Sequence, residues 1–178
     1  MAHGRRFRFG VQAHIATTGD EWADLARRAE DLGYSTLFMP DHFGDQLAPV
    51  PALMAAAAAT TTLRVGTLVL DNDYKHPLVL AKELATIDRL SGGRLEFGLG
   101  AGWMTTDYHR AGIPMDPPSV RIARLEEALH VVEGLLSEGP CHHSGHFYEI
   151  DGLNSSPKPV QKPLPILIGR GGRKVLEP

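Results

Sequence analysis

The sequence predicts a parallel α/β fold, either a doubly wound sheet or a barrel. Segments with strand character alternate with amphipathic helices from residue 7 to residue 169. The alternation of Leu95 and Phe97 in the segment 94–98 predicts a short strand buried on both faces, as in a parallel sheet, and this strand runs into the glycine-rich loop 98–103. In parallel α/β folds ligands bind at the carboxyl ends of the strands, so we expect any functional site at that end of the sheet.

The first elements have clear periodicities. Residues 7–13 alternate well enough for a strand, and a second strand is expected at 35–39. Between them the helix 21–32 carries one apolar face and is stopped by Gly33, because glycine readily adopts the left-handed cap. This face is formed by Trp22, Leu25, Ala29 and Leu32.

The middle of the chain repeats the pattern. An alanine-rich helix at 51–60 precedes a strand at 63–70 that is rich in valine and leucine. The helix 77–90 has one apolar stripe, and the glycines of the turn 91–93 end it before the strand 94–98. The stripe consists of Leu80, Leu84, Ile87 and Leu90.

The last elements include an interruption. A long amphipathic helix is expected at 120–136 and a fifth strand at 165–169. Between them, residues 139–163 are rich in Gly, Ser and Pro and contain a small hairpin around residues 146–150. Such excursions usually decorate a rigid frame as loops or lids.

Composition excludes several classes of function. A net charge of −3 and a pI near 6.3 leave no electrostatic footprint for nucleic acid, and no apolar run is long enough to cross a bilayer. We therefore expect a cytoplasmic protein. The single cysteine, Cys141, forms no internal disulfide, and His142, His143 and His146 beside it lack a carboxylate at ligand spacing. No metal site is predicted.

Several short motifs occur in a characteristic order along the chain. They are 38–42 (FMPDH), Gly66-Thr67, 76–83, 91–94 (SGGR), 98–103, 121–127 (RIARLEE), 159–163 (PVQKP) and 168–172 (IGRGG). Together they resemble the luciferase-like monooxygenase superfamily, specifically its branch of coenzyme F420-dependent oxidoreductases. The resemblance implies a (β/α)8 TIM barrel of which residues 1–178, as a single domain, hold only about the first five βα units.

The resemblance also implies a deazaflavin site at the mouth of the barrel. Asp41 would contact coenzyme F420, and His42 would be the catalytic proton donor or acceptor, since a histidine exchanges protons near neutral pH. Thr67 matches a position where relatives bend the strand, often through a non-prolyl cis peptide. The implied coenzyme-binding residues are Asp41, Gly66, Thr67, Ala101, Gly102 and Thr106, and, after strand five, Gly171, Gly172, Lys174 and Val175.

Trp103 departs from the pattern of the sugar-phosphate dehydrogenases that the chain resembles. Those enzymes place a glutamate there as a second acid or base, whereas an indole forms a wall for an apolar or planar substrate. We therefore expect a small organic substrate other than a sugar phosphate. Asp71 and Asn72, which follow strand three at the ligand end, are expected to line the same pocket.

Two alternatives remain open at this point. The chain could be a luciferase-like monooxygenase that uses FMN and oxygen. It could also be a catalytically inactive, truncated barrel that acts only as a fragment or an assembly partner, since five strands of a parallel sheet leave an open edge and apolar surface. For the same reason we expect a homo-oligomer.

Overall fold

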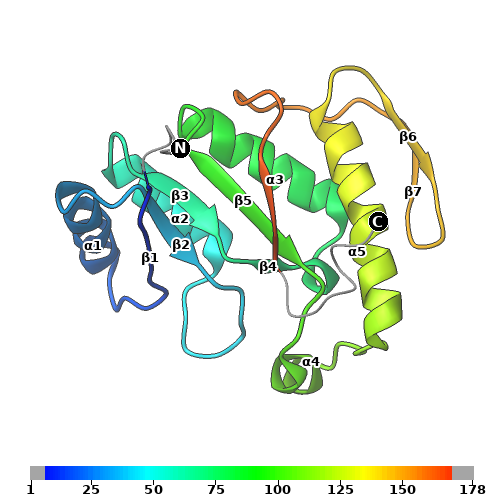
Figure 1. The fold of residues 1–178 in the computed structure, drawn as a ribbon, viewed down its shortest axis with the longest axis horizontal. Coiled ribbons are helices and arrows are strands. Elements are labelled where there is room, and N and C mark those ends of the chain that lie inside the picture. The colour runs from blue at the N-terminus through cyan, green and yellow to red at the C-terminus, as the bar shows by residue number, and fades with distance from the viewer. Residues whose placement is uncertain (1–6, 170–178) are drawn as a thin grey trace, which may run out of the picture.

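The computed structural model describes residues 7–169, and its main sheet is parallel throughout. The strands follow one another across the sheet in chain order, with β4 continuing β3 along the same edge of β5 (Figure 1). This order is that of a barrel and differs from the reversed order of a doubly wound sheet. The strands are β1 (Gly10–Gln12), β2 (Thr36–Met39), β3 (Arg64–Thr67), β4 (Leu70–Asp71), β5 (Leu95–Gly100) and β8 (Ile166–Gly169).

The helices begin and end where the sequence provides caps. Thr18 accepts the backbone N–H of Glu21 at the first turn of α1, prolines occupy the first turns of α2, α3 and α5, and Gly112 ends α4 with a φ of 68°. All four predicted helices are confirmed, whereas α4 and the short η1 were not predicted. The bounds are α1 (Gly19–Asp31), α2 (Pro49–Ala59), η1 (Asn72–Tyr74), α3 (Pro77–Leu90), α4 (Thr105–Ala111) and α5 (Pro118–Leu136).

The two faces of the sheet differ sharply in burial. Side chains that point toward the helices, such as Leu37, Val65 and Phe97, are completely buried in the core. On the opposite face the ring of Phe38 lies against both neighbouring strands, so a Cβ at Gly10 or Gly66 would collide with it. The two glycines of β1 and β3 are therefore needed to seat this one aromatic ring.

The predicted strand 63–70 is wrong as a single element. It is interrupted between β3 and β4, where the Leu68-Val69 peptide is cis. At the interruption the Thr67 hydroxyl donates to the carbonyl of Gly98 and accepts from its amide, both at 2.8 Å, which satisfies two buried backbone groups of β5. The expected bend after Thr67 is thus present, with its cis bond one residue further along the chain.

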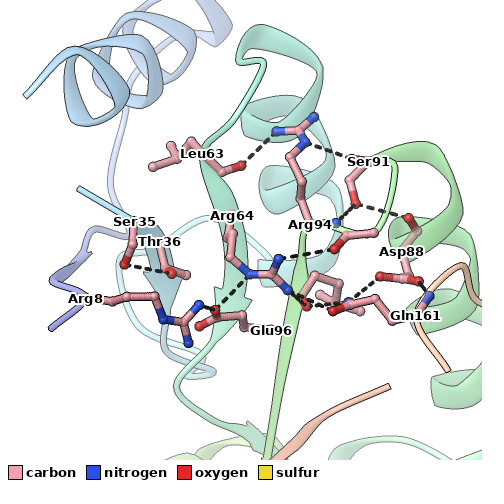
Figure 2. A network of polar contacts seen from close by, with 12 residues as sticks. Arg8, Ser35, Thr36, Leu63, Arg64, Asp88, Ser91, Arg94, Glu96 and Gln161 are labelled. Carbon is pink, nitrogen blue, oxygen red and sulfur yellow. Dashed lines mark hydrogen bonds and ion pairs between the residues drawn. The ribbon is translucent and has the colours of Figure 1, made fainter. Parts of the chain in front are cut away.

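A polar network ties the amino ends of the strands together (Figure 2). Arg64 binds Glu96 through Nε at 2.8 Å and the carbonyl of Leu95 through Nη2 at 2.9 Å. Its Nη2 also donates to Gln161 at 3.0 Å, and the Gln161 amide group donates to the fully buried Asp88 at 2.7 Å. This network fastens the segment before β8 beneath the sheet.

The excursion at 139–163 contains the predicted hairpin, which is longer than expected. Strands β6 (Cys141–Ser144) and β7 (Glu149–Leu153) pair antiparallel beside α5 (Figure 1). Glu127 of α5 accepts the backbone N–H groups of His146, Phe147 and Tyr148, which fixes the hairpin turn. Between residues 7 and 169, no helix has both the length and the apolar character needed to cross a membrane.

Candidate active site

His42 lies at the carboxyl end of β2, held by a carboxylate from a different element. Its Nδ1 lies 2.7 Å from Oδ2 of Asp107, which belongs to the first turn of α4. The indole of Trp103 meets the imidazole edge-on, with ring centroids 5.9 Å apart. The His42 side chain remains partly exposed while that of Asp107 is buried, so the imidazole is the member of the pair that a ligand can reach.

A hydrogen bond between Asp41 and Asp71 connects the segment after β2 with the end of β4. Oδ2 of Asp41 accepts the backbone N–H of Asp71 at 3.1 Å. Burial raises the pKa of Asp41 above its ordinary value, although the hydrogen bond from Asp71 partly opposes this. Burial raises the pKa of Asp71 further, to about 6, and the nearby charges of Asp73 and Asp41 act in the same direction.

Tyr108 of α4 lies between two carboxylates. Its hydroxyl is 3.0 Å from Oδ1 of Asp71 and 2.9 Å from Oδ2 of Asp73, yet it carries one proton and can donate to only one of them at a time. Asp73 has its own cation, since Oδ1 lies 2.7 Å from Nη1 of Arg124. Asp71 has no such partner among residues 7–169, and its burial without a cation favours the protonated carboxyl.

The loop after β5 is held from below by an arginine. Nη1 of the buried Arg121 donates to the carbonyl of Ala101 at 2.5 Å and also to that of Gly102. Its Nε donates to the carbonyl of Asp116 at 2.9 Å. The loop is thus fixed through its backbone, which leaves the Trp103 side chain free to project.

The glycines at the end of β5 and in the following loop are required by the packing of the chain itself. A Cβ at Gly98 would meet the carbonyl of Thr67, and one at Gly100 would meet the Val69 side chain at 2.9 Å. Gly102 has a φ of 72° and its Cβ position is filled by Tyr108 and Asp71. The side chains and backbone groups that exclude a larger residue at these positions belong to the protein itself.

The remaining predicted site residues are dispersed. Gly66, Thr67, Asp71 and Asn72 are buried, and Asn72 donates to the Tyr148 hydroxyl at 3.4 Å. Thr106 is exposed on α4, and Ala101 is partly exposed. Contact of these residues with a coenzyme or substrate stays a prediction. Gly171, Gly172, Lys174 and Val175 lie outside the described residues.

Sequence reasoning missed the supporting residues on the helices. Asp107 and Tyr108 follow the glycine-rich loop within six residues, but helix α4 is short and has no apolar stripe to reveal it. Arg121 belongs to the RIARLEE motif and reads as part of a charged helix face. Asp107 and Arg121 follow the loop by four to twenty residues, and no local sequence pattern shows that their side chains fold back to the site.

Large apolar side chains are exposed at the same end of the sheet as His42. Ile15, Phe43, Leu68 and Trp103 each follow a different strand at its carboxyl end, and all are exposed, Trp103 by 71%. The N–H of Leu68 donates to the carbonyl of Met39 at 2.8 Å, which places Leu68 beside the segment that leads to His42. Within residues 7–169, no three metal-ligating side chains converge.

Comparison with known families agrees with this architecture. Residues 5–177 match the luciferase-like monooxygenase family, and the chain belongs to it. It is 32% identical over 174 residues to an F420-dependent glucose-6-phosphate dehydrogenase of Nakamurella multipartita, covering 93% of this chain and 51% of that relative. It is also 32% identical over 150 residues to the oxygenase component of a flavin-dependent trigonelline monooxygenase of Acinetobacter baylyi, covering 82% of this chain and 41% of the relative.

A solved structure shows the same fold. The coenzyme F420-dependent tetrahydromethanopterin reductase of Methanopyrus kandleri superposes with a TM-score of 0.83 at 23% identity, over 93% of this chain and 50% of that one. The chain thus spans about half the length of the relatives and the structure that it matches.

Proposed function

We propose that this protein is an oxidoreductase that transfers a hydride between coenzyme F420 and a small organic substrate. The observation that carries the proposal is the His42–Asp107 pair at the carboxyl ends of the strands, 2.7 Å between Nδ1 and Oδ2, beside the exposed Trp103. An imidazole that is anchored at one nitrogen and partly exposed is suited to move a proton at the other.

The side chains around His42 fit a planar heteroaromatic ring. Trp103 and Leu68 offer exposed apolar surface on the two neighbouring strand ends, β5 and β3. The backbone of Ala101 and Gly102 is fixed by Arg121, so its position would not have to be ordered when a ring binds. These residues would hold the ring of the coenzyme, with Asp41 at its edge.

The division of chemistry follows from these groups. Coenzyme F420, when bound, supplies or accepts the hydride. His42 would take the proton from a substrate hydroxyl, or return it to a carbonyl oxygen, at the atom next to the carbon that exchanges the hydride. Trp103 and Leu68 would exclude water from that face of the site.

The charge around the site favours a neutral substrate over a sugar phosphate. Four carboxyl groups, those of Asp41, Asp71, Asp73 and Asp107, lie at the same end of the sheet, and within residues 7–169 only Asp73 among these four is paired with an arginine, Arg124. An anionic substrate would be repelled by this surplus, whereas an uncharged molecule with an apolar or planar body would pack on Trp103. Asp71 and Asn72, both buried, would act through the shape of the pocket floor.

A flavin-dependent monooxygenase is the second candidate. The 32% identity to the trigonelline monooxygenase component favours it, because that relative is as similar as the F420-dependent one. FMN and the deazaflavin share the same ring outline, and the apolar surfaces of Trp103 and Leu68 suit both.

Titration with the two coenzymes separates the candidates. We expect saturable quenching of F420 fluorescence by the full 178-residue chain, and a much weaker response with FMN. Trp103→Ala should weaken F420 binding about tenfold or more, while Phe9→Ala, a change at an equally exposed aromatic outside the site, should leave it unchanged. Binding of FMN alone would favour the monooxygenase, and binding of neither would leave the chain as a fragment or assembly partner.

A further inference from the structure

We propose that Asp107 is a positioning residue for His42, which holds the neutral imidazole with its proton on Nδ1 and so presents the lone pair of Nε2 to the reacting substrate. This inference rests on the proposed function for its catalytic meaning. The assignment of the ring proton to Nδ1 depends only on the contacts of Asp107.

The hydrogen bond defines which nitrogen carries the proton. Nδ1 of His42 and Oδ2 of Asp107 are 2.7 Å apart, within the range of charge-assisted bonds. An ionised carboxylate can only accept, so the imidazole must donate, and in its neutral form the single ring proton then lies on Nδ1. Nε2 has no hydrogen-bond partner among the described residues and is left as the acceptor.

The carboxylate of Asp107 makes no other polar contact among the described residues. Its side chain is 9% exposed, and within residues 7–169 its carboxylate contacts no lysine or arginine and no backbone N–H. The arginines nearby are engaged elsewhere, Arg124 with Asp73 and Asp116, and Arg121 with loop carbonyls. A buried carboxylate without a cation is costly, and its partner here is the imidazole.

A second histidine–carboxylate pair shows what a structural pair looks like in this protein. Nε2 of His143 lies 3.1 Å from Oε1 of Glu127, but Glu127 also accepts three backbone N–H groups of the hairpin turn. Glu127 would keep its role without His143. Asp107, in contrast, is dedicated to His42.

Nε2 of His42, which has no hydrogen-bond partner among the described residues, is the nitrogen that would exchange a proton with the substrate. If an alcohol is oxidised with coenzyme F420 as the hydride acceptor, Nε2 would accept the hydroxyl proton, and the products would be a carbonyl compound, the reduced coenzyme and an imidazolium beside Asp107. In the reverse direction Nε2 returns that proton to the carbonyl oxygen. The opposite tautomer would place a proton on Nε2 and could not accept another in the oxidative direction.

Nitrogen-15 NMR of the imidazole rings tests the assignment without coenzyme. In the 178-residue chain, with His42 assigned by comparison with His42→Gln, we expect the neutral ring to carry its proton mainly on Nδ1. Asp107→Asn and Asp107→Ala should shift the population toward the Nε2 proton, which is the intrinsically preferred form of imidazole, and Asp107→Glu should restore part of the Nδ1 form. Asp45→Asn, which makes the same charge change at an exposed position of the loop that carries His42, should have no effect.

The outcomes separate this inference from the proposed function. A wild-type His42 with its proton on Nε2 overturns the positioning role, as does an unchanged tautomer in both Asp107→Asn and Asp107→Ala. A folding defect in the variants does not remove the test, because the wild-type spectrum is decisive. F420 affinity within about threefold of wild type in Asp107→Asn supports a role through His42. If F420 does not bind but Nδ1 carries the proton, the proposed function fails and the positioning of His42 stands.

Discussion

Thr67 and Gly98 exchange two hydrogen bonds that a pair of strands would normally make through their backbones. The Thr67 hydroxyl donates to the Gly98 carbonyl and accepts from the Gly98 amide, each at 2.8 Å, at the point where β3 ends and before β4 begins. A Cβ on residue 98 would collide with the Thr67 carbonyl. The threonine and the glycine therefore belong together, and both are needed for the sheet to continue past the interruption.

Replacement of Thr67 by valine tests this relationship. Valine keeps the shape of threonine but cannot satisfy the buried amide and carbonyl of Gly98, so Thr67→Val should lower the free energy of unfolding by about 2–4 kcal/mol. The measurement is urea unfolding followed by circular dichroism. Thr86→Val, which removes one exposed hydroxyl on α3, is the control and should cost less than about 1 kcal/mol. Equal effects of the two changes would contradict the role given to Thr67.

Gly102 should tolerate alanine much less well than another glycine of the same conformation. Gly102 and Gly112 have φ values of 72° and 68°, but only at Gly102 is the Cβ position filled, by Tyr108 and Asp71. Gly112→Ala should therefore cost about 1 kcal/mol from backbone strain alone, and Gly102→Ala about 2–4 kcal/mol. Thermal unfolding of the two variants measures the difference. Similar losses would mean that the loop yields to the added methyl group.

Local patterns were sufficient for most of the fold. Apolar periodicity and glycine stops predicted the four long helices, because each of these helices buries a continuous stripe or begins at proline. The prediction of a single strand at 63–70 was wrong because the apolar run continues through the interruption. No residue in this run indicates that the pairing with the neighbouring strand is interrupted. The choice of a barrel over a doubly wound sheet depended on family resemblance, since strand order is a long-range property.

The candidate site was only partly predictable for the same reason. His42 and Trp103 each lie three residues beyond the carboxyl end of a strand. Because the carboxyl ends of parallel strands lie at the same end of the sheet, the fold brings the two side chains together. Asp107, Tyr108 and Arg121 reach the site through the path of the chain after β5, which no local signal defines. The glycines were noticed, but their packing partners come from other strands and helices.

The open face of the sheet should make the protein self-associate. Leu167 is exposed on this face and its neighbour Ile168 on the other face of the same strand, and the edge of β8 away from β5 is unpaired in the part of the chain that the structure describes. The predicted homo-oligomer would cover this surface. Leu167→Lys should shift the elution in size-exclusion chromatography toward the monomer, whereas Leu32→Lys, a change at the exposed leucine that caps the end of α1, should not. A monomeric wild-type protein at micromolar concentration would contradict this expectation.

Asp71 should make the stability of the protein depend on pH. Its pKa is raised from 3.8 to about 6, chiefly by burial, so between these values the native state binds more protons than the unfolded state. Stability contributed by the protonated carboxyl is therefore fully present below about pH 4 and is lost as the pH rises through about 6.

Asp71→Asn removes this titration while keeping an oxygen that can accept from Tyr108 and from the N–H of Asp73. Relative to wild type, the variant should gain about 2 kcal/mol in the free energy of unfolding between pH 4 and pH 7. Urea unfolding at pH values across this range gives the difference directly, and Asp45→Asn, at an exposed carboxylate, should show a nearly constant one. A constant difference for Asp71→Asn as well would mean that Tyr108 and the backbone stabilise the ionised carboxylate enough to cancel its burial.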